Sequence, residues 1–187
     1  MKKILVTGGA GYIGSHTVVE LINAGYTPII VDNLCNSSIK NIDGIEKIIG
    51  KKIKWHKKNC TDKAEMEKIF IEEGVILGTM HFAAYKSVEE SVKNPKKYYD
   101  NNIGSLKVLL ECMLENNVKN IIFSSSCTVY GTPEILPVNE NAPFNKAESP
   151  YGETKQICER ILKKDACNSI SLRYFNPIGS HNSSLIG

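Results

Sequence analysis

Short apolar runs alternate along this chain with segments whose apolar residues recur at helical spacing. The runs are rich in β-branched and aliphatic residues, predict strands, and lie at 2–7, 27–31, 53–57, 79–83, 119–124 and 169–174. The segments that predict helices lie at 13–24, 38–49, 62–73, 95–116 and 150–165. Strands that alternate with helices indicate a parallel sheet that is covered on both faces and joined by right-handed crossovers. The pattern therefore predicts a doubly wound α/β fold.

Two segments depart from this alternation. Residues 131–149 contain three prolines and few apolar positions at helical spacing, so we expect a long loop beside whatever the sheet binds. Residues 176–187 are rich in glycine, serine and asparagine and predict no regular element. We expect this tail to be a linker or an end cut short.

Composition argues against several classes of protein. The chain has 187 residues, of which 42% are hydrophobic and 23% are charged, as is typical of a globular domain. No apolar run reaches the length of about 18 residues that a membrane-spanning helix needs. The six cysteines form no CxxC pair and the four histidines show no ligand spacing. We therefore expect reduced thiols, a cytoplasmic location and no metal site.

A glycine-rich turn follows the first predicted strand. Gly8, Gly11 and Gly14 lie three residues apart around the start of the first predicted helix. In dinucleotide-binding folds such glycines allow a tight turn, let backbone amides approach a pyrophosphate, and let the helix pack closely on the sheet. The helix N-terminus adds unpaired amides and the positive end of a dipole. We therefore predict a dinucleotide site at this turn; a turn that binds no ligand is the alternative.

An acidic residue ends the second predicted strand. Asp32 stands where a carboxylate can accept a hydrogen bond from the 2′-hydroxyl of a ribose. The same charge repels a 2′-phosphate, and no arginine follows nearby to bind one. The sequence therefore favours NAD over NADP as the cofactor. The alternative is that Asp32 only caps the next turn.

A tyrosine and a lysine lie on one face of the helix predicted over 150–165. Tyr151 and Lys155 are four residues apart, and Ser149 is the candidate N-cap of this helix. An ammonium near a phenol favours the phenolate, so we expect Lys155 to lower the pKa of Tyr151 and make it a general base. Ser126, at the end of a predicted strand, can hydrogen-bond the same reacting hydroxyl. An amphipathic surface pair is the alternative.

Seven segments of the chain match motifs of a known family. On these segments the chain resembles the extended short-chain dehydrogenase/reductases, and within them the enzymes that epimerise UDP-sugars at C4. The glycine turn and the Tyr151 segment mark the larger family, whereas 32–37 and 173–177 are more specific to the epimerases. The matching segments lie at 7–16, 32–37, 81–86, 98–102, 124–131, 149–155 and 172–177.

The resemblance implies a tightly held NAD that oxidises the C4 hydroxyl of UDP-galactose or UDP-glucose and returns the hydride to the opposite face after the keto-sugar rotates. It implies Tyr151 as the base, Ser126 as its partner, and Lys155 as the residue that holds the nicotinamide ribose. The residues expected to contact the substrate are Lys86, Ser126, Tyr151 and Asn176. The residues expected to contact NAD are Gly8, Gly11, Tyr12, Ile13, Gly14, Asp32, Asn33, Leu34, Cys35, Asn36, Ser37, Asn59, Cys60, Phe82, Ala83, Ala84, Tyr85, Lys86, Asn101, Ser126, Tyr151, Lys155 and Phe175.

Two departures of the chain from the family pattern bear on its function. Asn59 stands where the family has an aspartate at the adenine contact, and its amide oxygen can still accept a bond from the adenine amine. The family also continues into a smaller substrate domain of about 100–150 residues. We therefore expect a dinucleotide-binding domain over 1–175 and, over 176–187, the start of a linker into a truncated substrate domain. In its full length the protein is expected to form a homodimer.

Other functions remain open. A sugar-nucleotide dehydratase is expected to carry carboxylates where this chain has Cys127 and Thr128, and a decarboxylase differs after the last strand. UDP-N-acetylhexosamines are an alternative substrate. A catalytically silent NAD-binding sensor has no need to retain the serine, tyrosine and lysine together. The basic stretch 51–58 could bind nucleic acid, but we favour a lysine-rich, solvated edge strand.

Overall fold

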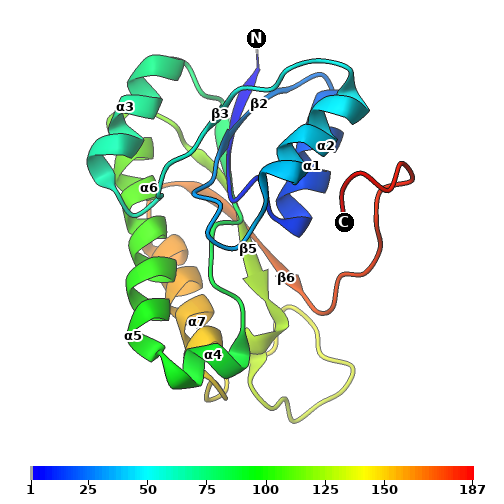
Figure 1. Cartoon of the computed structure of the whole chain (residues 1–187). Coiled ribbons are helices and arrows are strands. Elements are labelled where there is room, and N and C mark those ends of the chain that lie inside the picture. Colours follow the sequence, from blue (N-terminus) through cyan, green and yellow to red (C-terminus); the bar gives the residue numbers. More distant parts are fainter. Residues whose placement is uncertain (1) are drawn as a thin grey trace.

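A six-stranded parallel sheet runs through the middle of this computed structural model, which describes residues 2–187 (Figure 1). The strands lie in the order β3-β2-β1-β4-β5-β6. Their bounds are β1 Lys3–Thr7, β2 Thr27–Val31, β3 Trp55–His56, β4 Gly78–His81, β5 Asn120–Ser126 and β6 Asn168–Tyr174. The order reverses between β1 and β4, and in such sheets ligands bind outside the carboxyl ends of the strands at this point.

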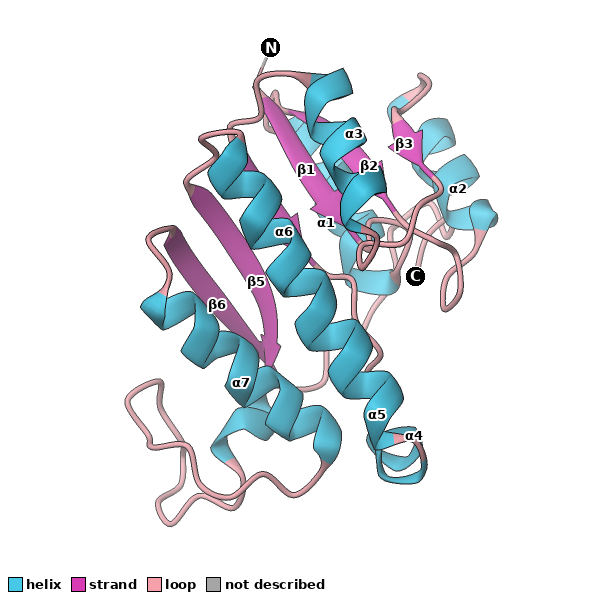
Figure 2. Ribbon diagram, turned by 90° about the vertical axis from the view of Figure 1, so that its left-hand side faces the viewer, coloured by secondary structure: helices cyan, strands magenta, loops and turns pink. Residues whose placement is uncertain are grey.

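Helices cover both faces of the sheet, which confirms the predicted doubly wound fold (Figure 2). One face carries α1 (Tyr12–Asn23) and α2 (Ile39–Ile49). The other face carries α3 (Lys63–Glu73), α6 (Gly104–Glu115) and α7 (Pro150–Lys164). Within residues 2–187, no helix is both long and apolar enough to cross a membrane.

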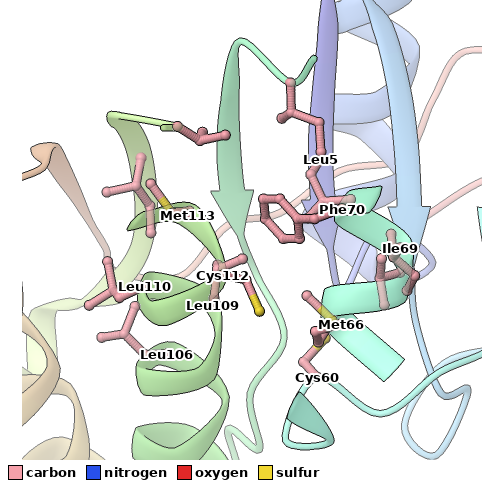
Figure 3. Close-up of a cluster of buried hydrophobic side chains, with 14 of the residues drawn as sticks. Leu5, Cys60, Met66, Ile69, Phe70, Leu106, Leu109, Leu110, Cys112 and Met113 are labelled. Atoms are coloured by element: carbon pink, nitrogen blue, oxygen red, sulfur yellow. The ribbon is translucent and has the colours of Figure 1, made fainter. Parts of the chain in front are cut away.

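Two apolar clusters join these helices to the sheet. Leu5 of β1 packs with Phe70 of α3 and with Leu109 and Met113 of α6, and all four side chains are buried (Figure 3). The cluster on the opposite face includes Ile30 and side chains of α1 and α2. Full burial of one such side chain is worth about 1.5–3 kcal/mol, so these clusters supply the main stabilisation of the layers.

The structure corrects the helix predicted over 95–116. That segment begins as α5 (Pro95–Tyr98), passes through a π-helical turn, η1 (Tyr99–Ile103), and continues as α6. A further helix, α4 (Val88–Lys93), precedes it and was not predicted. The turn places Asn102 against the backbone of Tyr85. The helical spacing of apolar residues cannot predict such a tertiary contact. The strand predicted over 53–57 is likewise reduced to the two residues of β3.

The loop over 131–149 follows a 3₁₀ turn, η2 (Cys127–Tyr130), beyond the carboxyl end of β5. Gln156 Nε2 donates to the Asn145 carbonyl oxygen at 2.7 Å, and Arg173 Nη1 donates to that of Glu140 at 3.0 Å. Residues 131–149 form no helix or strand, which confirms the predicted loop. Its predicted place beside the binding site is wrong: none of its residues lines the cavity, because the loop packs on α7 and Arg173 instead.

The tail over 176–187 forms no helix or strand, as predicted, but it packs on the face that carries α1 and α2 (Figure 1). The Tyr12 hydroxyl donates to the Gly179 carbonyl oxygen at 2.7 Å, and Ile186 is 3% exposed within the cluster on this face. A Cβ at Gly44 would lie 2.3 Å from the Leu185 carbonyl oxygen, so the tail meets α2 where only glycine fits. The tail is therefore packed against α1 and α2.

Candidate active site

A cavity of about 520 Å³ opens at the carboxyl ends of the strands. Its volume lies within the range of about 300–1,000 Å³ that is usual for small-molecule sites. Every residue that the sequence predicts for cofactor or substrate lines this cavity, with the exception of Leu34. The lining also includes Lys58, Val88, Ser105, Ser124, Ser125, Cys127, Thr128, Tyr174 and Pro177, which were not predicted.

Most of these further residues adjoin predicted ones in the chain. Ser124 and Ser125 precede Ser126 in β5, and Cys127 and Thr128 follow it in η2. The position of Ser126 at a strand end was a signal that could have found them. Val88 comes from α4, which was not predicted, and Ser105 comes from the start of α6, directly after the π-helical turn; no sequence pattern indicated either residue.

The glycine turn brings β1, α1 and β4 too close together for side chains. Gly8 has a φ of +70°, and a Cβ there would lie 2.6 Å from the Ala83 nitrogen. A Cβ at Gly14 would lie 2.2 Å from the Gly8 carbonyl oxygen. No side chain caps α1, whose N-cap is Gly11, so its first-turn amides are left for an anion.

Asp32 holds the end of β2 with its own carboxylate. The Oδ2 atom accepts from the Ala10 amide at 3.0 Å, and Oδ1 accepts at 2.9 Å from both the Leu34 amide and the Ser37 hydroxyl. The carboxylate is 7% exposed and lines the cavity. It therefore caps the turn, and its place in the cavity lining leaves the predicted ribose contact as a prediction. Leu34 has a φ of +61° and packs against the apolar cluster under α1 and α2, not into the cavity.

The predicted adenine contact, near Asp32 at one end of the cavity, is the polar and uncharged side chain of Asn59. Asn59 Oδ1 accepts from the Thr61 amide at 3.1 Å. Burial raises the pKa of the neighbouring Cys60 thiol to about 12, so this thiol keeps its proton. Cys35 Sγ lies 3.7 Å from the Tyr85 hydroxyl across the cavity.

The predicted catalytic residues meet at the other end. The Ser149 hydroxyl accepts from the Gly152 amide at 3.1 Å, which confirms Ser149 as the N-cap of α7 and starts the helix before Tyr151. Tyr151 and Lys155 then lie on the helix face toward β5, which ends at Ser126. All three side chains are buried and line the cavity.

The electrostatics of this end differ from the prediction. The Lys155 ammonium donates to the Ser124 carbonyl oxygen at 2.6 Å and lies 5.9 Å from the centre of the Tyr151 ring. Burial raises the pKa of Tyr151, and a hydrogen bond with Ser126 opposes that rise. The prediction that Lys155 lowers the pKa of Tyr151 is therefore wrong for this structure. Burial lowers the pKa of Lys155 itself to about 8.

A buried histidine lies between the two halves of the site. His81 ends β4, with its Nδ1 2.6 Å from the Thr7 hydroxyl and its Nε2 3.4 Å from the Ser105 hydroxyl. Burial, aided by the charge of Lys155, lowers the pKa of His81 to about 3. The imidazole is therefore neutral at neutral pH, and it links β1, β4 and α6 behind the cavity.

This geometry is that of a nucleotide site joined to a serine, tyrosine and lysine group. The model of the NAD dependent epimerase/dehydratase family matches residues 4–186 of the chain. The chain belongs to this family. The match extends over the sheet, both helical layers and almost all of the tail.

Individual members of the family resemble the chain closely over about half of their length. UDP-glucose 4-epimerases from Dictyostelium discoideum and Drosophila melanogaster are 52% and 47% identical to it, and the matches cover 99% and 98% of this chain but 55% of each relative. The structure of UDP-glucose 4-epimerase from Bifidobacterium longum in complex with NAD+ and UDP matches with a TM-score of 0.95 at 47% identity. That match covers 100% of this chain and 57% of the other.

The turn of this family member has the shape that a dinucleotide needs. At both Gly8 and Gly14 a Cβ would collide with backbone atoms, so only glycine fits and no side chain covers the backbone of the turn beside the cavity. The unpaired amides of α1 supply donors for a pyrophosphate, and Asp32 supplies an acceptor for a ribose. The residues present therefore fit the cofactor that the family name implies.

Charged groups around β3 pair with one another, and one of them, Lys58, also lines the cavity. Lys52, Lys54 and Lys58 of the basic stretch form ion pairs with Glu46, Glu72 and Glu65. These pairs favour the solvated-edge explanation of the stretch. The structure also brings His56, Glu72 and Glu73 within 4.8 Å, a grouping that the sequence did not indicate. Lys54 pairs with both carboxylates and His56 bonds Glu73 at 2.9 Å, so the group is an ion-pair network at the end of α3.

Proposed function

We propose that the protein binds NAD in the cavity, with the pyrophosphate at the glycine turn and the adenosine ribose on Asp32. The close backbone approach at Gly8 and Gly14 supports the phosphate position. The carboxylate of Asp32 supports NAD over NADP, because it would repel a 2′-phosphate. Asn59 and Cys60 then lie beside the adenine, and the nicotinamide end reaches Tyr151, Lys155 and Phe175, which line the far part of the cavity.

We further propose that the protein interconverts UDP-galactose and UDP-glucose. The observation that carries this proposal is the convergence of Ser126, Tyr151 and Lys155 on the cavity that also contains the glycine turn. The names of the relatives at 52% and 47% identity support the same substrates. Asn176 and Lys86 line the cavity and are the proposed contacts of the substrate.

Tyr151 moves the proton in this reaction. Its phenolate takes the proton of the C4 hydroxyl, while the Ser126 hydroxyl holds the same oxygen. Bound NAD would supply the hydride acceptor for C4 and the hydride donor for the ketone. In the second half the neutral phenol gives the proton back to the ketone oxygen, so Tyr151 acts in both protonation states. Ser126 favours the phenolate and burial favours the phenol, and these opposed effects suit a group that must serve as both.

Inversion at C4 requires the sugar to turn while the nucleotide stays bound. The hydride leaves one face of the sugar and returns to the other, so the keto-sugar rotates between the two steps. This needs a firm hold on UDP and a loose hold on the hexose. We propose that the part of the substrate site beyond Asn176 lies in a domain outside this chain, with the tail as the start of the connection.

Proton NMR of UDP-galactose incubated with the full-length protein tests this function. The expected result is an equilibrium mixture with UDP-glucose while the total NAD stays unchanged. A 4-keto-6-deoxy sugar would indicate a dehydratase instead. No reaction from a folded protein loaded with NAD would refute the epimerase and favour an NAD-binding sensor. UDP-N-acetylglucosamine, tested in parallel, decides the breadth of substrates.

The cellular setting and assembly are part of the proposal. All six cysteines are free thiols, which suits a reducing compartment such as the cytoplasm. We propose a homodimer for the full-length protein. Light scattering of the full-length protein tests this, and a monomer mass at micromolar concentration would refute it.

A further inference from the structure

Two fixed points hold the segment that follows β6. Residues 175–180 are all exposed, so burial of side chains does not fix their position. Asn176, the proposed contact of the substrate, belongs to this segment and lines the cavity. On one side the segment continues from β6, which ends at Tyr174. On the other side the Gly179 carbonyl oxygen accepts a hydrogen bond from the Tyr12 hydroxyl at 2.7 Å. The position of Asn176 therefore depends on β6 and on Tyr12.

Tyr12 presents this hydroxyl from a fixed support. It is the first residue of α1, and it lines the cavity beside the glycine turn. Its carbonyl oxygen accepts from the Ser15 hydroxyl at 3.0 Å, and its ring packs edge-on against the ring of His16 with 5.3 Å between the ring centres. The backbone of Tyr12 thus belongs to the cofactor part of the cavity, whereas its hydroxyl reaches the tail.

The tail closes on itself and is docked on α2 (Figure 1). The His181 amide donates to the Ile186 carbonyl oxygen at 3.0 Å, which closes a turn over 181–186. Ile186 is 3% exposed within the apolar cluster of this face. At Gly44 of α2 an added Cβ would lie 2.3 Å from the Leu185 carbonyl oxygen. Gly44 does not line the cavity, so a substitution there disturbs the docked tail without touching the site.

We propose that Tyr12 is a positioning residue: its hydroxyl, together with the strap formed by residues 178–186, holds Asn176 ready for the UDP part of the substrate. A contact that is ordered in advance binds more tightly, because binding does not have to supply the cost of ordering it. The inference deepens the proposed function and rests on it, since Asn176 matters only where a UDP-sugar binds in the cavity. It gives Tyr12 a role toward the substrate in addition to its expected contact with NAD.

Calorimetric titration of the full-length, NAD-loaded protein with UDP tests this role. Tyr12→Phe removes only the hydroxyl, and the affinity for UDP should fall by about two- to tenfold, the usual effect of one hydrogen bond. Gly44→Ala acts on the other end of the strap and should also weaken UDP binding. The double variant should bind UDP no more weakly than the weaker single variant, because both changes release the same strap.

Matched controls and a second measurement separate release of the strap from a general loosening of the fold. Tyr26→Phe and Gly104→Ala make the same chemical changes at positions that do not line the cavity, and the affinity for UDP should stay unchanged. Hydrogen exchange of the peptide over 176–187, followed by mass spectrometry, should quicken in Tyr12→Phe and Gly44→Ala. Exchange in β1 and β4 should stay as in the wild type.

Three outcomes would overturn the inference: unchanged UDP affinity in Tyr12→Phe, weaker UDP binding without faster exchange in the tail, or additive losses in the double variant. If Gly44→Ala does not fold, Tyr12→Phe decides alone, because it removes a single hydroxyl that bonds an exposed residue. If the NAD-loaded wild type binds no UDP, the proposed substrate is refuted and this inference falls with it. Normal UDP binding by the wild type, with no change in Tyr12→Phe, refutes the inference alone.

Discussion

Asn102 hydrogen-bonds both backbone groups of Tyr85. Its Oδ1 accepts from the Tyr85 amide at 2.8 Å, and its Nδ2 donates to the Tyr85 carbonyl oxygen at 3.0 Å. The π-helical turn points this side chain at the segment after β4, whose residues 82–86 line the cavity. Phe82, the first residue of this segment, still bonds Thr7 of β1, and the Asn102 side chain supplies the bonds to the backbone of Tyr85 three residues later.

Asn102→Leu should therefore destabilise the fold and weaken NAD binding. Leucine keeps the volume but leaves two backbone groups of Tyr85 without partners, a loss of about 1–3 kcal/mol in the free energy of unfolding. Urea unfolding measures this loss. Asn23→Leu, at an exposed site of α1 where the amide bonds only Glu20 at 3.5 Å, is the control and should stay within about 0.5 kcal/mol. Equal effects of the two variants would contradict the role of Asn102.

Gly14→Ala should abolish NAD binding. The added Cβ would lie 2.2 Å from the Gly8 carbonyl oxygen, so the turn must open before the residue fits. Gly104→Ala is the control: Gly104 lies in α6, where an added Cβ would be 3.8 Å from the Thr61 methyl carbon, and the change should raise stability by about 0.4–1 kcal/mol. Calorimetric titration with NAD measures binding. Normal NAD affinity in Gly14→Ala would exclude the turn as the phosphate site.

Tyr151→Phe should lower kcat and leave NAD binding intact. The change removes only the hydroxyl, and loss of a positioned general base typically costs about 10²- to 10⁴-fold in rate. The rate of UDP-glucose formation from UDP-galactose measures the effect, with NAD content checked by absorbance. Tyr26→Phe, outside the cavity, should retain full activity. Wild-type turnover in Tyr151→Phe would assign the proton transfer to another group.

Stability should fall in acid because of His81. Its pKa of about 3 in the folded protein lies below the ordinary value of 6.5. At a pH between these two values, His81 is protonated in the unfolded chain and neutral in the folded protein. The free energy of unfolding should then fall by up to about 1.4 kcal/mol per pH unit from this group as the pH drops below 6.5, with no contribution above it. His81→Gln should show a shallower dependence in urea unfolding between pH 4 and 7, on the order of that slope. Parallel curves for the two proteins would contradict the buried neutral imidazole.

The sequence was informative where local signals and tertiary structure agree. Thr27–Val31 is a strand with the predicted bounds, and Ser149 caps its helix as predicted, because both depend on neighbours in the chain. Gly8, Gly11 and Gly14 line the cavity as predicted, because the turn that they form follows directly after β1 in the chain. Placement of the predicted contacts there follows from the rule that parallel strands end at one edge.

The errors arose where distant contacts decide the outcome. The π-helical turn contains Asn102, which bonds Tyr85 and Thr154 far away in the sequence. The spacing of Tyr151 and Lys155 correctly placed them on one face. It gave no sign that Lys155 would bond the Ser124 carbonyl oxygen or that burial would raise the pKa of Tyr151.

The lining of the cavity extends from Gly8, just after β1, to Pro177, just after β6. During synthesis the chain emerges from its N-terminus, so the glycine turn leaves the ribosome long before β6 can pair with β5. The part of the cavity that is lined by residues 174–177 is therefore complete only after that pairing. A nucleotide that contacts both ends of the cavity would bind the paired sheet more tightly than the nascent early half, and would so stabilise the later state against proteases.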